Sequence, residues 1–192
     1  MSVSPAVPLF SSCQYLVNFI SFQIVAYSWL TDSVVWDMHT YFRYPTKQQG
    51  RIWLKRRQDI SPSDIAKQMK VSRPYVSKAQ RVAEQRISKL LKNAATINRI
   101  SIEHSSSKFG FAVGYCPGYQ STSYITYSPQ FGVQVWFDHE GDCGRCPEKS
   151  ICEKTIRGLA REWKLEFPSD VNISQAASML FKAIMRKMGW VE

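Results

Sequence analysis

A histidine and three cysteines lie close together in the C-terminal half of the chain, spaced as His139-x3-Cys143-x2-Cys146-x5-Cys152. Imidazole and thiolate groups are ligands for zinc, and two cysteines separated by two residues can both reach one ion. Four such ligands leave no open position, which is typical of a structural site. We therefore expect these residues to hold a zinc ion that ties the last strand of a sheet to the following helix.

Two other interpretations of the cysteines remain open. Cys143, Cys146 and Cys152 with a remote fourth cysteine, Cys116, resemble the iron–sulfur motif of some nucleases, which would make the protein a redox-sensing regulator. Alternatively, the cysteines are reduced and bind no metal. The chain has five cysteines, the fifth being Cys13, and an odd number that is clustered in this way does not favour a disulfide framework.

A second set of residues, within the segment SRPYVSKAQR, could read the bases of DNA. Arginine and lysine donate to guanine O6 and N7, glutamine pairs with adenine, and a tyrosine ring contacts the methyl group of thymine. The residues that we expect to contact DNA are Ser72, Arg73, Pro74, Tyr75, Ser77, Lys78, Gln80 and Arg81.

The positive charge of the chain lies almost entirely around this segment. Between Arg43 and Arg99 there are fifteen lysines and arginines and three acidic residues, whereas basic and acidic residues are equal in number after Arg99. A compact basic block neutralises phosphate groups and releases their condensed counterions. Nucleic acid is therefore the first candidate partner. The alternative is that these charges form a solvated surface that binds no partner.

The residues between 61 and 81 predict two short helices that position these side chains. Ser61 is suited to cap the first helix, with Pro62 at its first position and Asp64 near its positive end, and Ser72 starts the second helix in the same way. The apolar positions between the caps suit two helices that cross at a steep angle. They are Ile65, Ala66, Met69, Val71, Val76 and Ala79. Together these features predict a helix-turn-helix, whose second helix enters the major groove.

The segment from about Gln49 to Leu91, with its IA pair and the string VSRPYVSK, resembles the helix-turn-helix of Tfx-type archaeal regulators and of the promoter-reading region of bacterial sigma factors. Lys70 departs from the pattern, because many members have glycine in the turn, and a lysine there must accept a left-handed backbone or a changed turn. The resemblance implies a transcription factor. We expect it to bind double-stranded DNA in the cytoplasm, with the transcription machinery as a further candidate partner, and we do not expect an enzyme.

The remaining patterns predict an α+β protein. Thr46-x-x-Gln49 opens a helix through Arg57 that offers Ile52, Trp53 and Leu54 to a core, and a long helix runs from Arg73 to about Asn98. Four alternating runs then predict a small antiparallel sheet, followed by two helices. The expected strands are 100–104, 111–116, 123–128 and 133–139, and the expected helices are about 150–165 and from 172 onward. We divide the chain into 1–45, 46–98 (DNA-binding) and 99–192 (sheet, metal knuckle and C-terminal helices).

The long helix carries a continuous apolar seam. The seam consists of Val76, Ala79, Ala83, Ile87, Leu90, Ala94 and Ile97. It could pack on the first helix and on the sheet, or it could join two copies of the chain. We favour a homodimer, because most helix-turn-helix proteins read paired half-sites.

An apolar stretch from Val7 to Leu30 is long enough to be considered as a membrane span, but polar residues interrupt it and no basic region precedes it. It could be an anchor or an apolar arm; we favour a segment that precedes the true start at Met38, where the composition changes abruptly. We do not expect a membrane partner.

An enzyme that processes nucleic acid is the alternative function. Its candidate carboxylates would be Glu103, Asp138, Glu140 and Asp142. They lie beside a charged turn without a catalytic spacing, which favours their interpretation as solvated loop residues.

Overall fold

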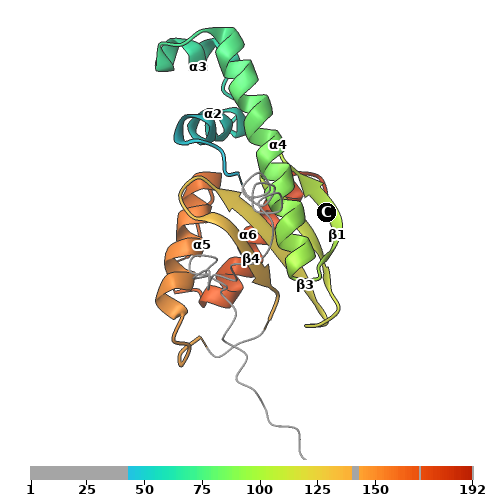
Figure 1. The fold of residues 1–192 in the computed structure, drawn as a ribbon. Coiled ribbons are helices and arrows are strands. Elements are labelled where there is room, and N and C mark those ends of the chain that lie inside the picture. Colours follow the sequence, from blue (N-terminus) through green and yellow to red (C-terminus); the bar gives the residue numbers. More distant parts are fainter. Residues whose placement is uncertain (1–42, 140–142, 169, 192) are drawn as a thin grey trace, which may run out of the picture. The chain divides into compact units, whose positions relative to one another are not determined.

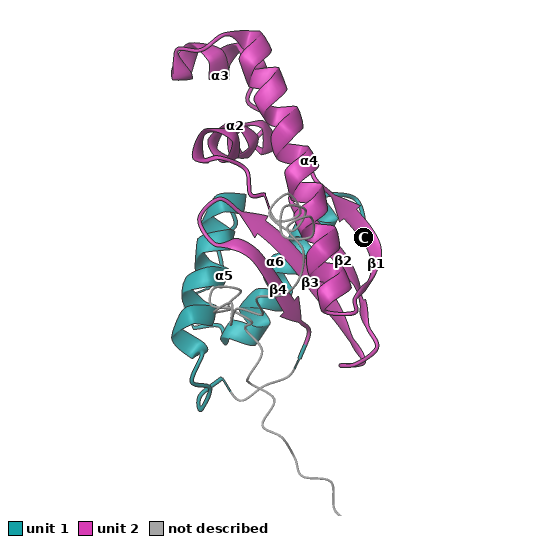
Figure 2. Cartoon of the chain, viewed as in Figure 1, with its two compact units in different colours: residues 1–17, 139–192 teal, residues 18–138 magenta. Residues whose placement is uncertain are grey.

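The computed structural model describes residues 43–139, 143–168 and 170–191 (Figure 1). These residues form two compact units, one of residues 43–138 and one of the described residues from 139 onward (Figure 2). The first unit contains α2 (Lys47–Arg57), α3 (Pro62–Met69), α4 (Arg73–Ile97), β1 (Ser101–Ser106), β2 (Phe111–Cys116), β3 (Ser121–Ser128) and β4 (Gly132–Phe137), and the second contains α5 (Lys149–Trp163) and α6 (Ile173–Lys187). The α+β class is confirmed. The apolar stretch 7–30 lies outside the described residues, as does Met38.

The strands form one antiparallel sheet in the order β1-β2-β3-β4, which confirms the predicted meander. Tyr124 of β3 stands opposite Val113 of β2 on one side and Trp136 of β4 on the other. The pairing of β1 with β2 shifts between Ile102 and His104, which marks a β-bulge in this edge strand. A bulge at an edge hinders pairing with a further strand, so β1 is protected against edge-to-edge association.

Helix α2 begins with the predicted capping box. The backbone N–H of Gln49 donates to Thr46 Oγ1 at 3.3 Å, and the backbone N–H of Thr46 donates to Gln49 Oε1 at 3.0 Å. The two adjacent residues Ile52 and Trp53 are fully buried, whereas Leu54 is only partly buried. Local capping thus fixes where α2 begins, and the burial of Ile52 and Trp53 fixes which side faces inward.

The core of the first unit lies between the sheet and the C-terminal half of α4. Helix α4 covers one face of the sheet and contacts β1, β3 and β4 (Figure 1). The buried residues of this core come from α2, α4 and the sheet. They are Trp53, Ala83, Ile87, Leu90, Leu91, Ala95, Ile100, Ala112, Cys116, Ile125 and Tyr127. Helix α4 and the sheet therefore share one hydrophobic core.

Trp53 attaches α2 to this core through several contacts. Its indole Nε1 donates to the carbonyl oxygen of Ser107 at 3.0 Å, and its ring meets Tyr127 edge-on with 5.2 Å between centroids. The guanidinium of Arg57 lies 4.9 Å from the centroid of the indole. Gly110 has a positive φ of 64°, and a Cβ there would lie 2.7 Å from Trp53 Cζ2. Only glycine leaves room for the indole at this position.

This shared core spans the position between residues 98 and 99, where the sequence suggested a domain boundary. The compact units instead divide after residue 138, because α4 and the sheet bury the same apolar residues against each other. Most of the predicted seam of α4 is buried inside the chain, with Ala83, Ile87 and Leu90 on the sheet and Val76 and Ala79 against α2 and α3. Ala94 is only partly buried and Ile97 is 48% exposed, while Leu91 and Ala95 are buried at this end of the helix. The buried part of the seam is not available for a dimer contact.

In the second unit, α5 and α6 contact each other. Asn172 caps α6 by accepting a hydrogen bond from the backbone N–H of Ser174 at 3.2 Å, as its position in the sequence predicted. The buried positions of α6 include Ala177, Leu180 and Ile184, whereas Met188 at the helix end is only partly buried. Across the described ranges, no helix is both long and apolar enough to cross a membrane.

Replacement of Gly110 by alanine tests the fit of Trp53. Gly110→Ala should lower the free energy of unfolding by about 1–2 kcal/mol for the left-handed backbone and by about a further 1–3 kcal/mol for overlap with the indole. Gly132→Ala is the matched control, because Gly132 has a φ of 71° and its nearest neighbour would lie at an ordinary 3.6 Å. Urea unfolding followed by circular dichroism measures both. Equal losses for the two variants would contradict the proposed fit.

Candidate nucleic-acid interface

Helices α3 and α4 both start as their sequences predict. Ser61 Oγ accepts a hydrogen bond from the backbone N–H of Asp64 at 3.1 Å and donates to its carboxylate at 2.6 Å. Ser72 Oγ accepts from the backbone N–H of Tyr75 at 3.3 Å. Each cap satisfies a backbone donor that the first helical turn leaves unpaired.

The connection between the two helices closes around Lys70. Its backbone is left-handed, with φ of 53° and ψ of 46°. The N–H of Val71 donates to the carbonyl of Ala66 at 3.0 Å, and the N–H of Lys70 donates to that of Lys67 at 3.3 Å, which is the Schellman pattern. Lysine thus accepts the conformation that glycine would adopt more easily. Asp59, Arg99 and Lys164 take the same backbone conformation after α2, α4 and α5.

An apolar cluster holds α3 against α4. Ile65 and Val76 are fully buried in it, and Ala66 at the crossing is small enough to let the helices approach. Every apolar residue predicted for this contact belongs to the cluster, with Met69 and Val71 partly buried at its edge, and α2 adds Ile52. The cluster therefore fixes which side chains of α4 point outward.

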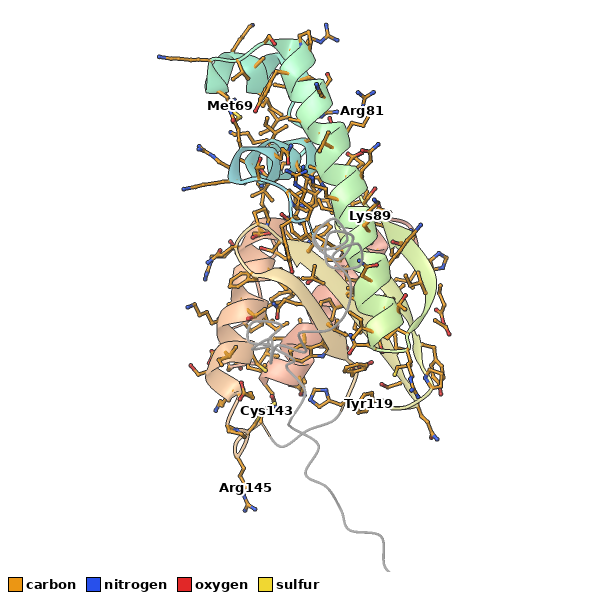
Figure 3. The ribbon with its side chains drawn as sticks, in the orientation of Figure 1. Met69, Arg81, Lys89, Tyr119, Cys143 and Arg145 are labelled. Carbon is orange, nitrogen blue, oxygen red and sulfur yellow. The ribbon has the colours of Figure 1, made fainter. Side chains whose placement is uncertain are left out.

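The basic residues at the start of α4 lie on the outward side. Arg73, Lys78 and Arg81 are exposed, and none of them forms an ion pair within the described part of the chain. Figure 3 shows Arg81 extending away from the axis of α4. Their charges are available for an anionic partner.

The other predicted contact residues at the start of α4 are exposed, but two of them form hydrogen bonds within the chain. Ser72 is occupied as the cap, and Pro74 and Ser77 are exposed to solvent. Tyr75 is 40% exposed, and its hydroxyl donates to Gln48 Oε1 at 2.9 Å. The ring remains accessible while the hydroxyl ties α4 to the start of α2.

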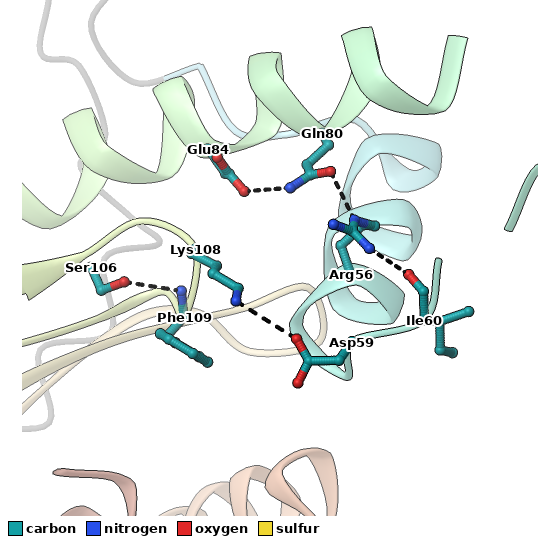
Figure 4. A network of polar contacts seen from close by, with 8 residues as sticks. All are labelled: Arg56, Asp59, Ile60, Gln80, Glu84, Ser106, Lys108 and Phe109. Atoms are coloured by element: carbon teal, nitrogen blue, oxygen red, sulfur yellow. Dashed lines mark hydrogen bonds and ion pairs between the residues drawn. The ribbon is translucent and has the colours of Figure 1, made fainter. Parts of the chain in front are cut away.

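Gln80 has a role that its position in the sequence did not predict (Figure 4). Its Oε1 accepts a hydrogen bond from Arg56 Nε at 2.9 Å, and its Nε2 donates to Glu84 Oε1 at 2.9 Å. Arg56 also donates to the carbonyl of Ile60 at 2.7 Å. Both amide atoms are thus engaged within the chain, where the sequence predicted pairing with adenine. The spacing of Gln80 and Glu84, four residues apart on a helix, was the available signal.

The sequence also did not predict the hydrogen bonds of Arg86, which join α4 to the start of α2 and the residues before it. Arg86 Nη1 donates to Gln49 Oε1 at 2.8 Å and to the carbonyl of Tyr44 at 3.2 Å. Burial, and then the charge of Arg43, lower the pKa of Arg86. Two guanidinium groups are therefore held near each other beside α4.

Among the described residues, the structure does not bring the candidate metal ligands together into one group of three or more. His139 follows β4, Cys143 and Cys146 lie in the turn before α5, and Cys152 is in the first turn of α5. Burial, and then nearby Cys143 and Glu148, raise the pKa of Cys152 to about 11. Within residues 43–139, 143–168 and 170–191, no group of three or more His, Cys, Asp or Glu side chains is placed to hold a metal. Zinc binding stays a prediction.

Cys116, the remote ligand of the iron–sulfur alternative, is a core residue. It is 1% exposed, and its thiol donates to the carbonyl of Asn98 at 3.5 Å. The sheet therefore uses Cys116 to pack against the end of α4.

Two of the candidate carboxylates, Glu103 and Asp138, lie in or next to the sheet and not on α4. Glu103 is exposed on the edge strand β1, and Asp138 is exposed after β4. Burial, and then the charge of Asp138, raise the pKa of Tyr124. Glu140 and Asp142 lie outside the described residues.

Comparison of the chain with models of known protein families, with curated proteins and with solved structures found no match. The resemblance to Tfx-type regulators thus stays an expectation from residues 49–91. A fold alone does not define a function, so the function has to come from the residues of the site.

Substitution of Lys70 tests the left-handed turn. Lys70→Gly should raise the free energy of unfolding by about 1 kcal/mol, because glycine adopts positive φ without steric cost. Lys70→Ala keeps the strain while it removes the exposed charge, so its effect should stay within about 0.5 kcal/mol. Chemical unfolding of both variants provides the measurement. A Lys70→Gly protein no more stable than Lys70→Ala would show that the turn carries no strain.

The reactivity of Cys152 tests whether its thiol is free or bound to metal. In metal-free protein, iodoacetamide should modify Cys152 slowly at about pH 7 and faster toward pH 11, because only the thiolate reacts. Unfolding in urea should accelerate the reaction near neutral pH, since it ends the burial. Peptide mass spectrometry follows the modification. Rapid reaction of the folded protein near neutral pH would contradict the raised pKa, and acceleration by a chelator alone would support zinc.

Proposed function

We propose that the chain binds double-stranded DNA and regulates transcription, with α3 and α4 acting as a helix-turn-helix. The observation that carries this proposal is the start of α4, where Arg73, Lys78 and Arg81 project from a closed apolar cluster with no acidic partner among the described residues. In a helix-turn-helix, the first turns of the second helix enter the major groove. The basic face of α4, formed by Arg73, Lys78 and Arg81, is the part that would enter the groove.

The side chains at the start of α4 have different roles in this proposal. Arg73, Lys78 and Arg81 offer donors to guanine or to phosphate. The exposed ring of Tyr75 contacts a thymine methyl, with its orientation set by Gln48. Gln80 acts through Arg56, because its hydrogen bond with Arg56 joins α4 to α2 while its bond to Glu84 fixes the amide along α4. We therefore assign Gln80 as a positioning residue and the three cations as the principal contacts.

The proposal extends to the oligomeric state, the metal and the location of the protein. A homodimer that reads paired half-sites fits the function, and its contact would lie outside the buried seam of α4. Cys146 is oxidised in a disulfide in this structure, so zinc binding by His139, Cys143, Cys146 and Cys152 requires its reduction. The zinc would then stabilise the connection to α5 without taking part in DNA binding. The cytoplasm is the corresponding location.

A triple substitution tests DNA binding. R73A/K78A/R81A should bind duplex DNA much more weakly than the wild type, because each lost contact costs about 1–3 kcal/mol. The matched control is K149A/K154A/K182A, which removes three exposed lysines from α5 and α6. Mobility shift with duplexes selected from a random pool measures affinity, and circular dichroism checks folding.

Two outcomes would overturn the proposal. The first is a wild-type protein that selects and binds no duplex. The second is equal affinity of the R73A/K78A/R81A variant and the wild type, or an equally large loss in the control. A folded triple variant with weakened binding, beside a control that binds normally, would support the proposal.

A further inference from the structure

The basic face of α4 does not end at Arg81. Lys78, Arg81, Lys89 and Lys92 are all exposed, and none forms an ion pair within residues 43–139, 143–168 and 170–191. Their spacing places them along one side of the helix, opposite the buried residues Ala83, Ile87 and Leu90. Figure 3 shows Arg81 and Lys89 along this helix. These four residues form a positively charged stripe that continues from the start of α4 onto its C-terminal half, which covers the sheet.

A hollow beside α4 concentrates further charge near this stripe. Its described lining includes five cations and a single acid. The cations are Arg43, Arg81, Arg86, Lys89 and Lys92, and the acid is Glu84. The carboxylate of Glu84 already accepts a hydrogen bond from Gln80. Cations gathered with so little compensating charge repel one another, and a partner with several negative charges relieves that repulsion.

The distance along α4 separates the stripe into two parts. A helix rises about 1.5 Å per residue, so Lys89 and Lys92 lie about 12 and 17 Å beyond Arg81. The major groove of DNA is about 12 Å wide. When the first turns of α4 lie in the groove, Lys89 therefore lies at about its width from Arg81 and Lys92 lies beyond it, at the level of the flanking phosphates.

We propose that Lys89 and Lys92, with Arg43 beside them, bind backbone phosphates of the duplex whose bases contact the start of α4. The proposal rests on the DNA binding proposed above and adds a second contact region of a different kind. Phosphate contacts set affinity and register without reading sequence, whereas base contacts set specificity. The two halves of α4 thus divide these tasks between them.

The dependence of affinity on salt tests this division. Each phosphate contact contributes about 0.9 to the slope of the logarithm of the binding constant against the logarithm of salt concentration. K89Q/K92Q should therefore reduce the magnitude of the slope by about 1.8 and leave the order of preference among selected duplexes unchanged. K149Q/K154Q, on α5, is the matched control and should leave the slope unchanged. Fluorescence anisotropy with a labelled duplex provides the titrations.

The outcomes distinguish this proposal from the DNA-binding proposal itself. If the wild type binds no duplex, both proposals fail. If R73A/K78A/R81A weakens binding while K89Q/K92Q keeps the wild-type slope, only the phosphate contacts are overturned. A changed order of sequence preference in K89Q/K92Q, or an equal change of slope in K149Q/K154Q, would overturn them as well. Thermal unfolding monitored by circular dichroism confirms that each variant is folded.

Discussion

Two adjacent residues of α2 enter two different cores, and the arrangement of the first unit depends on them. Ile52 packs with Ile65 and Val76, between α2, α3 and α4. Trp53 packs with Tyr127, between α2, α4 and the sheet. Because a helix places consecutive side chains about 100° apart, one turn of α2 reaches both cores at once. The indole fits only because the chain has no side chain at residue 110, so a constraint in the β1–β2 turn fixes the helices.

The same arrangement explains how a strongly basic segment folds stably. Helix α4 keeps an apolar side for its two cores and a charged side for solvent, so repulsion among Lys78, Arg81, Lys89 and Lys92 is reduced by water and salt. Gln80, a polar side chain between α2 and α4, is hydrogen-bonded to Arg56 and Glu84. The exposed cations thus lie on a surface that contributes little to packing.

Local signals in the sequence predicted much of this structure, and long-range contacts account for what they missed. The caps at Ser61 and Ser72 depend on groups three residues away, so the helix starts were predictable. The bond from Trp53 to Ser107 spans 54 residues and has no local pattern, so the sequence did not indicate that α2 packs against the sheet. The internal role of Gln80 required knowing where Arg56 lies. Cysteine spacing suggested a metal site, but spacing alone does not fix how the side chains converge.

Helix α4 is one unbroken rod of 25 residues, about 37 Å long. Beyond Pro74 in its first turn it contains no proline or glycine, the residues at which helices most often kink, so it offers no built-in hinge. Its first turns carry the basic face, and its last turns are clamped to the sheet through Leu90, Leu91 and Ala95. A displacement of the sheet would consequently tilt the start of α4, because the helix has no flexible point between its two ends. The orientation of the basic residues at the start of α4 is thus coupled to the position of the sheet.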